Sequence, residues 1–292
     1  MYQKIEACPS CDSKEQTLFK ICKDYTVSGE TFAIVECKNC GFKFTNPRPD
    51  EQSIGKYYES EEYISHTDKA QGFIQQVYKL VRGITLYRKY RLISKLVAKG
   101  KILDIGCGTG DFLTQFKDRN WEVRGVEKST KSRAIAIEKN GNIISEDLSQ
   151  IEDQGYDVIT LWHVLEHIHT LNETLTRIRK LVKKDGYIVI AVPNEASFDA
   201  KHYGEHWAAY DVPRHLYHFN QKTLKEIAKK NKLKVKKILP MKWDSFYVSM
   251  LSEKNKGNTN PFLKGLFMGL RSNTWARNHN NNYSSVLYIL NK

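Results

Sequence analysis

The stretch KILDIGCGTG, residues 101–110, constrains the fold of this chain more than any other segment. Its apolar run ends in three glycines at alternate positions, Gly106, Gly108 and Gly110. Glycines this close together are needed where a backbone turns sharply and approaches a ligand without side chains in between. The pattern therefore predicts a buried strand that breaks into a tight turn at the start of a helix.

The spacing of these glycines argues against two phosphate-binding sites. A dinucleotide fingerprint G-x-G-x-x-G would need glycine where the chain has Asp111, and a P-loop would need G-K-S/T. Carboxylates stand near the turn instead, with Asp104 just before the first glycine and Glu127 at the end of the next apolar run. Glu127 suits a ribose diol, and Asp104 favours a ligand with positive charge. S-adenosylmethionine has a ribose, an ammonium and a sulfonium, and it carries no phosphate.

The segment DIGCGTG, followed by Glu127, resembles motif I and the post-II acidic residue of class I S-adenosylmethionine-dependent methyltransferases. A glycine turn in another doubly wound fold is the alternative. In the resembled family an acidic residue like Asp147 contacts the adenine amino group, and Leu148 would flank the ring. A helix N-cap or a turn is the other interpretation of Asp147. The resemblance implies that the cofactor-binding residues are Asp104, Gly106, Cys107, Gly108, Gly110, Glu127, Asp147, Leu148 and Trp162.

Strand and helix patterns alternate after residue 100, which predicts an α/β fold with a doubly wound, Rossmann-like sheet. The sheet is expected to be mainly parallel, with an antiparallel C-terminal strand. Ligands in such sheets bind beyond the carboxyl ends of the strands. We expect strands at 101–105, 121–126, 142–144, 156–161, 186–192, 233–239 and 284–292, and helices at 110–118, 129–139, 171–182 and 221–231.

Two cysteine pairs near the N-terminus predict a structural zinc site. The ligands would be Cys8, Cys11, Cys37 and Cys40. Paired C-x2-C knuckles in a cytosolic chain favour tetrahedral zinc over disulfides, and four thiolates leave no open coordination position. The gap between the pairs is longer than in most zinc ribbons, so the hairpin between them should carry an extended loop at KDYTVSGE. The remaining cysteines, Cys22 and Cys107, are expected to be packing or turn residues.

The prolines of FKFTNPRPDEQ mark the exit from this zinc module and a boundary near residue 50. We expect a zinc ribbon at 1–50, a helical lid or connector at 51–99, and the methyltransferase domain at 100–292. Acceptor-binding insertions are expected at 197–220 and 241–283. Four side chains of the connector could cover the cofactor pocket or pack in the core: Tyr57, Tyr58, Tyr63 and His66.

The segment LWHVLEHIH, residues 161–169, follows the fourth main strand, where methyltransferases bring the acceptor to the methyl group. Its V-L-E-H resembles the matching segment of small-molecule methyltransferases related to those of ubiquinone biosynthesis. On a helix, His163 and His167 would share a face and could bind metal, but no third ligand is obvious. The segment lacks the D/N-P-P-Y/F motif that exocyclic-amine DNA methyltransferases and some RNA methyltransferases place here.

The stretch at 197–220 is dense in His, Tyr and Trp and is expected to be a functional loop. Its D-V-P-R-H-L-Y-H-F resembles a segment of bacterial methyltransferases encoded with glycan biosynthesis. It more distantly resembles sugar C-methyltransferases, which also begin with a C-x2-C…C-x2-C zinc module and an N-P-x-P exit. In those enzymes a histidine matching His215 is the proposed base, and Arg214 replaces the glutamate before it. A structural role for His215 in the loop, with Asp211 and Arg214 paired, is the alternative.

Charge and hydropathy limit the partners. The net charge of +13 favours an anionic partner, whether nucleic acid, anionic lipid or a phosphorylated small molecule, although a solvated basic surface explains it equally well. The N-terminus lacks the apolar core of a signal peptide, and no apolar run is long enough to span a bilayer, so a cytoplasmic protein is expected. Residues 261–270 could rest on a membrane or form a buried helix.

These observations predict an enzyme that transfers the sulfonium methyl to an oxygen or carbon nucleophile of a small, anionic acceptor. A nucleotide-linked or lipid-linked sugar fits this description. The candidate general base is His215, with His163, His206 and Tyr210 as weaker candidates. An RNA base methyltransferase that grips phosphates through the zinc ribbon and basic surface is the alternative, and a non-catalytic cofactor-binding protein is a third possibility.

Overall fold

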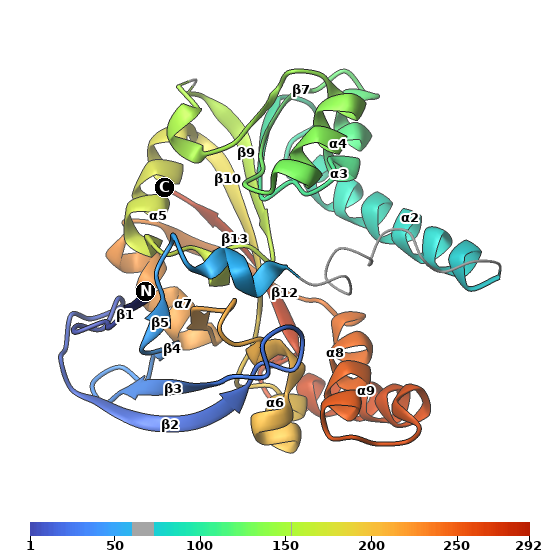
Figure 1. Cartoon of the computed structure of the whole chain (residues 1–292). Coiled ribbons are helices and arrows are strands. Elements are labelled where there is room, and N and C mark those ends of the chain that lie inside the picture. The colour runs from blue at the N-terminus through green and yellow to red at the C-terminus, as the bar shows by residue number, and fades with distance from the viewer. Residues whose placement is uncertain (60–72, 153) are drawn as a thin grey trace. The chain divides into compact units, whose positions relative to one another are not determined.

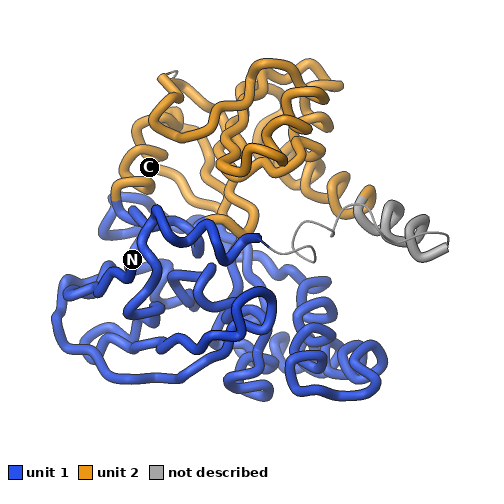
Figure 2. Tube along the Cα trace, in the orientation of Figure 1, with its two compact units in different colours: residues 1–66, 165–172, 191–288 blue, residues 67–164, 173–190, 289–292 orange. Residues whose placement is uncertain are grey.

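The structure is a computed structural model that describes residues 1–59, 73–152 and 154–292, with only the backbone for residues 73–82. Its largest sheet has seven strands in the hydrogen-bonded order β12-β13-β10-β9-β6-β7-β8 (Figure 1). Helices separate successive strands along the chain, so the predicted α/β fold is confirmed. The chain divides into two compact units (Figure 2).

Unit 2 comprises residues 67–164, 173–190 and 289–292 and holds the glycine turn. Strand β6 (Lys101–Ile105) pairs in parallel with β7 (Glu122–Val126) on one side and with β9 (Tyr156–Trp162) on the other. Strand β7 also pairs in parallel with β8 (Ile144–Ser145). Because the strand order changes direction beside β6, the turn that follows β6 lies at a topological switch point, where such sheets bind ligands.

The helices of unit 2 begin and end close to the predicted positions. The turn leads into α3 (Asp111–Lys117), whose Phe112, Leu113 and Phe116 are buried. Helix α4 (Thr130–Asn140) starts at the Ser129 N-cap. The strand after α5 (Leu171–Leu181) is β10 (Val182–Pro193), and it begins immediately after the helix rather than at the predicted residue 186. The remaining elements are α2 (Phe73–Ser94) and η2 (Leu148–Gln150).

Unit 1 comprises residues 1–66, 165–172 and 191–288 and contains both cysteine pairs. Its sheet has the strand order β11-β4-β3-β2, with β2 (Gln16–Lys23), β3 (Thr31–Cys37) and β4 (Lys43–Thr45). The extended hairpin loop that the sequence predicts at KDYTVSGE lies between β2 and β3. The fourth strand, β11 (Tyr217–His218), comes from the distant stretch at 197–220.

The stretch at 197–220 is not the long loop that the sequence predicts. It forms α6 (Phe198–Tyr203) and two 3-10 turns, η4 (Gly204–His206) and η5 (Ala208–Tyr210), before β11. Tyr203, Trp207 and Tyr210 of this stretch are buried in one cluster with Phe32 and Ile34 of the β2–β3 hairpin. Burial of this apolar surface explains why the segment folds back onto the β2–β3 hairpin.

The rest of the described part of unit 1 has two short 3-10 helices, together with strands and α-helices. No helix among the described residues is long and apolar enough to cross a membrane. In the larger sheet, the last two strands of the chain are adjacent, β12 beside β13. The elements are β1 (Tyr2–Gln3), β5 (Arg48–Pro49), η1 (Ile54–Tyr58), η3 (Leu165–His167), α7 (Gln221–Lys230), β12 (Lys234–Pro240), α8 (Asp244–Asn255), α9 (Pro261–Asn278) and β13 (Ser285–Asn291).

The compact units do not coincide with the three-part division at residues 50 and 99, which stays a prediction. Of the four proposed lid residues, Tyr63 and His66 lie outside the described residues. Tyr57 is buried in the core of unit 1 and donates a 2.7 Å hydrogen bond to Glu30. Tyr58 lies with its hydroxyl 3.0 Å from the Nδ1 of His167.

Candidate functional site

The glycine turn of unit 2 is held by backbone hydrogen bonds to the end of β7. The amides of Gly106 and Cys107 both donate to the Val126 carbonyl, at 2.7 and 3.0 Å. All three glycines have positive φ, at +70°, +54° and +77° for Gly106, Gly108 and Gly110. This left-handed backbone is costly for other residues, which explains the alternating glycines. Cys107 is buried in the turn, as predicted.

The three glycines differ in the space that is available for a Cβ atom. A Cβ atom at Gly106 would collide with the side chain of Val164, and one at Gly110 would collide with Asn140. At Gly108, by contrast, no described atom lies within 4 Å of that position. Two glycines therefore allow close packing, whereas Gly108 leaves open space beside the turn. Contact of the three glycines with the cofactor stays a prediction.

Glu127 stands at the end of β7, as predicted, and binds the turn directly. Its carboxylate accepts hydrogen bonds from the Gly108 amide at 2.8 Å and from the Ser129 amide at 2.9 Å. Each carboxylate oxygen has further acceptor capacity. The residue can therefore support the turn and still accept hydrogen bonds from a ribose diol.

Asp104 lies beneath the turn and is only 2 % exposed. Its carboxylate accepts a 2.5 Å hydrogen bond from the Thr160 hydroxyl of the neighbouring strand β9. Burial raises the pKa of Asp104 to about 7, although the Thr160 hydrogen bond and the Lys89 charge oppose this shift. Asp104 is thus buried in unit 2 and bonded to the neighbouring strand, and its contact with the cofactor stays a prediction.

The other predicted cofactor residues also belong to unit 2. Asp147 is exposed and caps the short helix η2 by accepting a 2.8 Å hydrogen bond from the Ser149 amide. This backbone hydrogen bond lowers the pKa of the Asp147 carboxyl group. The helix-cap interpretation is therefore confirmed, and contact with adenine stays a prediction. Leu148 follows in η2 and is half-buried, as is Trp162 at the end of β9.

His163 follows β9 in a left-handed backbone conformation, with a φ of 56°. The short helix η3 begins only at Leu165, so His163 and His167 do not share the face of one helix. Left-handed non-glycine residues are uncommon and concentrate at functional sites.

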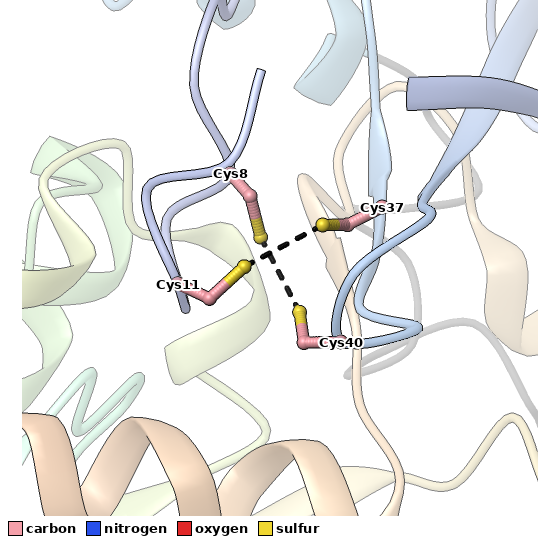
Figure 3. Close-up of side chains that lie close together, drawn as sticks. All are labelled: Cys8, Cys11, Cys37 and Cys40. Carbon is pink, nitrogen blue, oxygen red and sulfur yellow. Dashed lines mark hydrogen bonds between the residues drawn. The ribbon is translucent and has the colours of Figure 1, made fainter. Parts of the chain in front are cut away.

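In unit 1 the four predicted zinc ligands converge (Figure 3). The sulfur of Cys8 is 3.6 Å from that of Cys40, and the sulfur of Cys11 is 3.6 Å from that of Cys37. These distances exclude disulfide bonds, whose sulfurs are about 2 Å apart. They are close to the edge of about 3.8 Å that a tetrahedron of thiolates around zinc would have. The donor set and its geometry fit one Zn²⁺ ion.

A second cluster in unit 1 joins η3 to the segment before β11. The donor atoms of Glu166, His167 and His215 lie within 4.8 Å of one another, so these side chains could also hold a divalent metal. The two imidazole rings are 4.6 Å apart in a T-shaped arrangement. Burial lowers the pKa of His167 to about 4, and the neighbouring His215 adds to this effect. His167 is therefore neutral near pH 7.

His215 has one fixed and one available ring nitrogen. Its Nδ1 lies 2.8 Å from the Ala209 carbonyl oxygen, and because a carbonyl only accepts hydrogen bonds, Nδ1 must carry hydrogen. In the neutral ring the lone pair is consequently on Nε2. That atom lies 4.0 Å from a Glu166 oxygen and 3.9 Å from an Asp211 oxygen. Two carboxylates are thus placed to stabilise the imidazolium that forms when Nε2 takes up a proton.

A buried guanidinium fixes the backbone around His215. Arg214 is 1 % exposed and donates to both oxygens of Asp211, at 2.6 and 3.0 Å. It also donates to Asp24 at 2.9 Å and to the Tyr57 carbonyl at 2.9 Å. The predicted pairing of Asp211 with Arg214 is confirmed. Both the hydrogen bonds and the positive charge of Arg214 lower the pKa of the Asp24 carboxyl group despite its burial.

Two other candidates from the aromatic stretch have structural contacts. Tyr210 is 3 % exposed and packs against Trp207 and His218 in the core of unit 1. Its burial raises the pKa of the phenol, which opposes a role as a base. His206 lies 2.7 Å from the hydroxyl of Tyr25 at the surface.

The family model described as a methyltransferase domain matches residues 75–238, more than half of the chain. The chain belongs to this methyltransferase family. The predicted resemblance to class I S-adenosylmethionine-dependent methyltransferases is therefore confirmed.

Curated relatives of this methyltransferase match over shorter stretches. The ubiquinone biosynthesis O-methyltransferase of Rickettsia conorii is 26 % identical over 123 residues, which cover 40 % of this chain and 43 % of that protein. The enzyme of the same description from Saccharophagus degradans is 29 % identical over 107 residues, which cover 34 % of this chain and 45 % of the relative. The chain thus spans less than half the length of these relatives.

Solved structures resemble the methyltransferase over most of its length. Magnesium protoporphyrin IX methyltransferase from Synechocystis PCC 6803 has a TM-score of 0.52 at 14 % identity and covers 82 % of this chain and 99 % of its own. Geranyl diphosphate C-methyltransferase from Streptomyces coelicolor A3(2) has a TM-score of 0.56 at 13 % identity, with coverages of 82 % and 97 %. At this identity the similarity concerns the fold.

Sequence reasoning did not identify Glu166 as a neighbour of His215, nor Asp24 as a partner of Arg214. Glu166 stands in the same V-L-E-H segment as the candidate histidines, and its adjacency to His167 was the available signal. Asp24 lies in the loop between the cysteine pairs, and nothing in the sequence indicates its contact with Arg214.

Proposed function

We propose that this protein transfers the methyl group of S-adenosylmethionine to an oxygen or carbon atom of a small acceptor. The observation that supports this most strongly is the turn of unit 2, where Gly108 faces open space and Glu127 binds its amide. Glu127 would accept hydrogen bonds from the ribose hydroxyls, and the absence of a Cβ at Gly108 would let the cofactor approach the backbone. Asp147 and Leu148 would contact the adenine.

His215 is the proposed general base. As the acceptor attacks the methyl carbon, the carbon–sulfur bond breaks and S-adenosylhomocysteine leaves. The proton of the acceptor passes to Nε2 of His215, whose lone pair is kept available by the Nδ1 hydrogen bond to Ala209. Glu166 and Asp211 would then stabilise the positive ring. His163 and Tyr210 remain weaker candidates: His163 has an unusual backbone conformation, and Tyr210 is buried with a raised pKa.

Zinc is the proposed ligand of the four cysteines. It would act structurally, because Cys8, Cys11, Cys37 and Cys40 complete its tetrahedral coordination. The ion would fix the turns at the base of the β2–β3 hairpin, whose other end contributes Asp24 to Arg214. In this way it would support the segment that carries His215.

The acceptor is proposed to be a small anionic molecule, such as a nucleotide-linked or lipid-linked sugar. The positive net charge of +13 favours such acceptors. Incubation with S-adenosylmethionine labelled in the methyl group, followed by mass spectrometry of an acceptor panel, tests the proposal. The panel should contain nucleotide sugars, isoprenoid-linked sugars, phenols and RNA. Transfer to a small molecule supports the proposal, and transfer to RNA bases alone would contradict it.

A further inference from the structure

Helix α9 (Pro261–Asn278) has apolar residues on two opposite faces. One face is buried and consists mainly of small residues: Gly265, Met268, Gly269, Ser272 and Ala276. A Cβ atom at Gly265 would collide with Met250 of α8, and one at Gly269 would collide with Phe246. Helices α8 and α9 therefore pack closely through the small-residue face of α9. The opposite face of α9 is not needed for this packing.

The opposite face carries large apolar side chains that are open to solvent. Leu263, Phe267 and Leu270 are 60, 66 and 58 % exposed, and with 100° between successive helix positions they project to one side. Phe262 lies at the start of the same helix and is 59 % exposed. We call Leu263, Phe267 and Leu270 the outer face of α9. An exposed apolar surface of this kind marks a docking site more often than single exposed residues do.

The charge around the outer face indicates the chemistry of its partner. Residues 241–283 contain six basic side chains, and all six are exposed: Lys242, Lys254, Lys256, Lys264, Arg271 and Arg277. The same residues include only two acidic ones, Asp244 and Glu253. Glu253 is buried and accepts a hydrogen bond from Tyr203, so it contributes little to the surface charge. The outer face therefore lies in a positively charged region.

Two aromatic residues extend the pattern at the beginning of the neighbouring helix α8. Trp243 is 62 % exposed and Tyr247 is 47 % exposed. Trp and Tyr favour the level of the lipid headgroups, where one side of the ring is apolar and the other is wet. Exposed Leu and Phe, flanking Lys and Arg, and nearby Trp and Tyr together form the pattern of an interfacial helix.

We propose that the outer face of α9 binds the surface of an anionic lipid bilayer, with α9 in the plane of the interface. Its apolar side chains enter the headgroup and acyl boundary, and Lys264 and Arg271 contact the lipid phosphates. This inference does not depend on the proposed methyl transfer. Binding to vesicles can be measured without S-adenosylmethionine or an acceptor, so failure of one proposal would leave the other intact.

The test is flotation of the full chain with vesicles of phosphatidylcholine, with or without phosphatidylglycerol. We expect binding to the anionic vesicles, and at least about a tenfold weaker partition for the double variant Phe267→Ser/Leu270→Ser, which loses two apolar insertions. Lys264→Gln should weaken binding to anionic vesicles about fivefold and leave neutral vesicles unaffected. Melting temperatures of the variants check that each remains folded.

The matched control is Leu18→Ser/Ile21→Ser, because these β2 side chains are 58 and 57 % exposed but belong to another surface of unit 1. It should bind anionic vesicles like the wild type. Equal binding by wild type and the Phe267→Ser/Leu270→Ser variant, or no vesicle binding at all, would overturn the proposal. A concentration-dependent dimer that this variant abolishes, without any vesicle binding, would assign the outer face to a second copy of the chain instead.

Discussion

The glycine turn of unit 2 and the His215 cluster of unit 1 are built from different parts of the chain. The turn depends on backbone: three left-handed glycines, amides donating to Val126, and one carboxylate that binds an amide. The His215 cluster depends on buried side chains that come from three distant segments, with Arg214 joining Asp24 to Asp211. A backbone site needs local sequence only, whereas a side-chain site needs the whole unit to fold.

The glycine turn and the His215 cluster should therefore respond differently to substitutions. A substitution in the turn should change cofactor binding and local strain, because backbone amides make the hydrogen bonds that hold the turn. A substitution among the buried charges of unit 1 should affect stability first, since it leaves a charged partner without compensation.

The largest expected effect is that of Arg214→Ala. It would leave Asp24 and Asp211 without their shared guanidinium, and the loss of one partner from a buried ion pair costs about 3–5 kcal/mol. Urea denaturation should show this loss in the free energy of unfolding. Arg277→Ala is the control, because Arg277 is exposed. A change below about 1 kcal/mol, the usual scale of a surface ion pair, would mean that the buried charges do not organise unit 1.

His215→Gln should act on turnover rather than on stability. Loss of a general base commonly lowers the rate about 10²- to 10⁴-fold, and glutamine can still donate a hydrogen bond to the Ala209 carbonyl. His202→Gln, at an exposed position, serves as the control. A shared fall in melting temperature and activity would instead assign His215 a structural role.

The two glycines of the turn should respond differently to alanine. Gly106→Ala combines a positive φ with a collision against Val164, so we expect a lower melting temperature together with loss of cofactor binding. Gly108→Ala adds only the left-handed backbone cost of about 1–3 kcal/mol, and its methyl group enters open space. It should weaken cofactor binding more than stability. If both substitutions changed the melting temperature and the cofactor affinity equally, the two glycines would not have different roles.

Local patterns allowed much of unit 2 to be predicted from the sequence. The apolar runs, the glycines and Glu127 lie within one βαβ segment, and the predicted strand at 101–105 coincides with β6. In unit 1 the cysteine spacing predicted the sulfur cluster. It could not show that β11 joins the hairpin sheet, because that pairing connects Tyr217 to Phe44 across most of the chain.

The contacts of individual residues were harder to predict, because they also join segments that are distant in the sequence. A Cβ atom at Gly106 would collide with Val164 because the segment after β9 packs against the turn. The proximity of Glu166 to His215 depends on the path of two segments that are distant in the sequence. Periodicity and motifs carry no information about such contacts.

The pH dependence of stability should have opposite signs in the two units. Burial raises the folded-state pKa of Asp104 from its ordinary value near 4 to about 7, so its contribution is fully present below pH 4 and is lost as pH rises to 7. Burial lowers the pKa of His167 to about 4, so its contribution is present above pH 6.5 and is lost as pH falls to 4.

Chemical denaturation between pH 4 and pH 7 can separate these contributions. Asp104→Asn should make stability rise more steeply with pH than in the wild type, and His167→Gln should make it rise less steeply. Identical pH slopes for both variants and the wild type would contradict the assigned pKa shifts.

Calorimetric titration with S-adenosylhomocysteine tests the central claim, that the turn of unit 2 is the cofactor site, most directly. We predict saturable binding by the wild type, and about tenfold to hundredfold weaker binding by Glu127→Ala, which loses charged hydrogen bonds to the ribose. Glu122→Ala, at an exposed position of the same strand, should bind like the wild type. Unchanged affinity in a folded Glu127→Ala variant, or no binding by the wild type, would contradict the account.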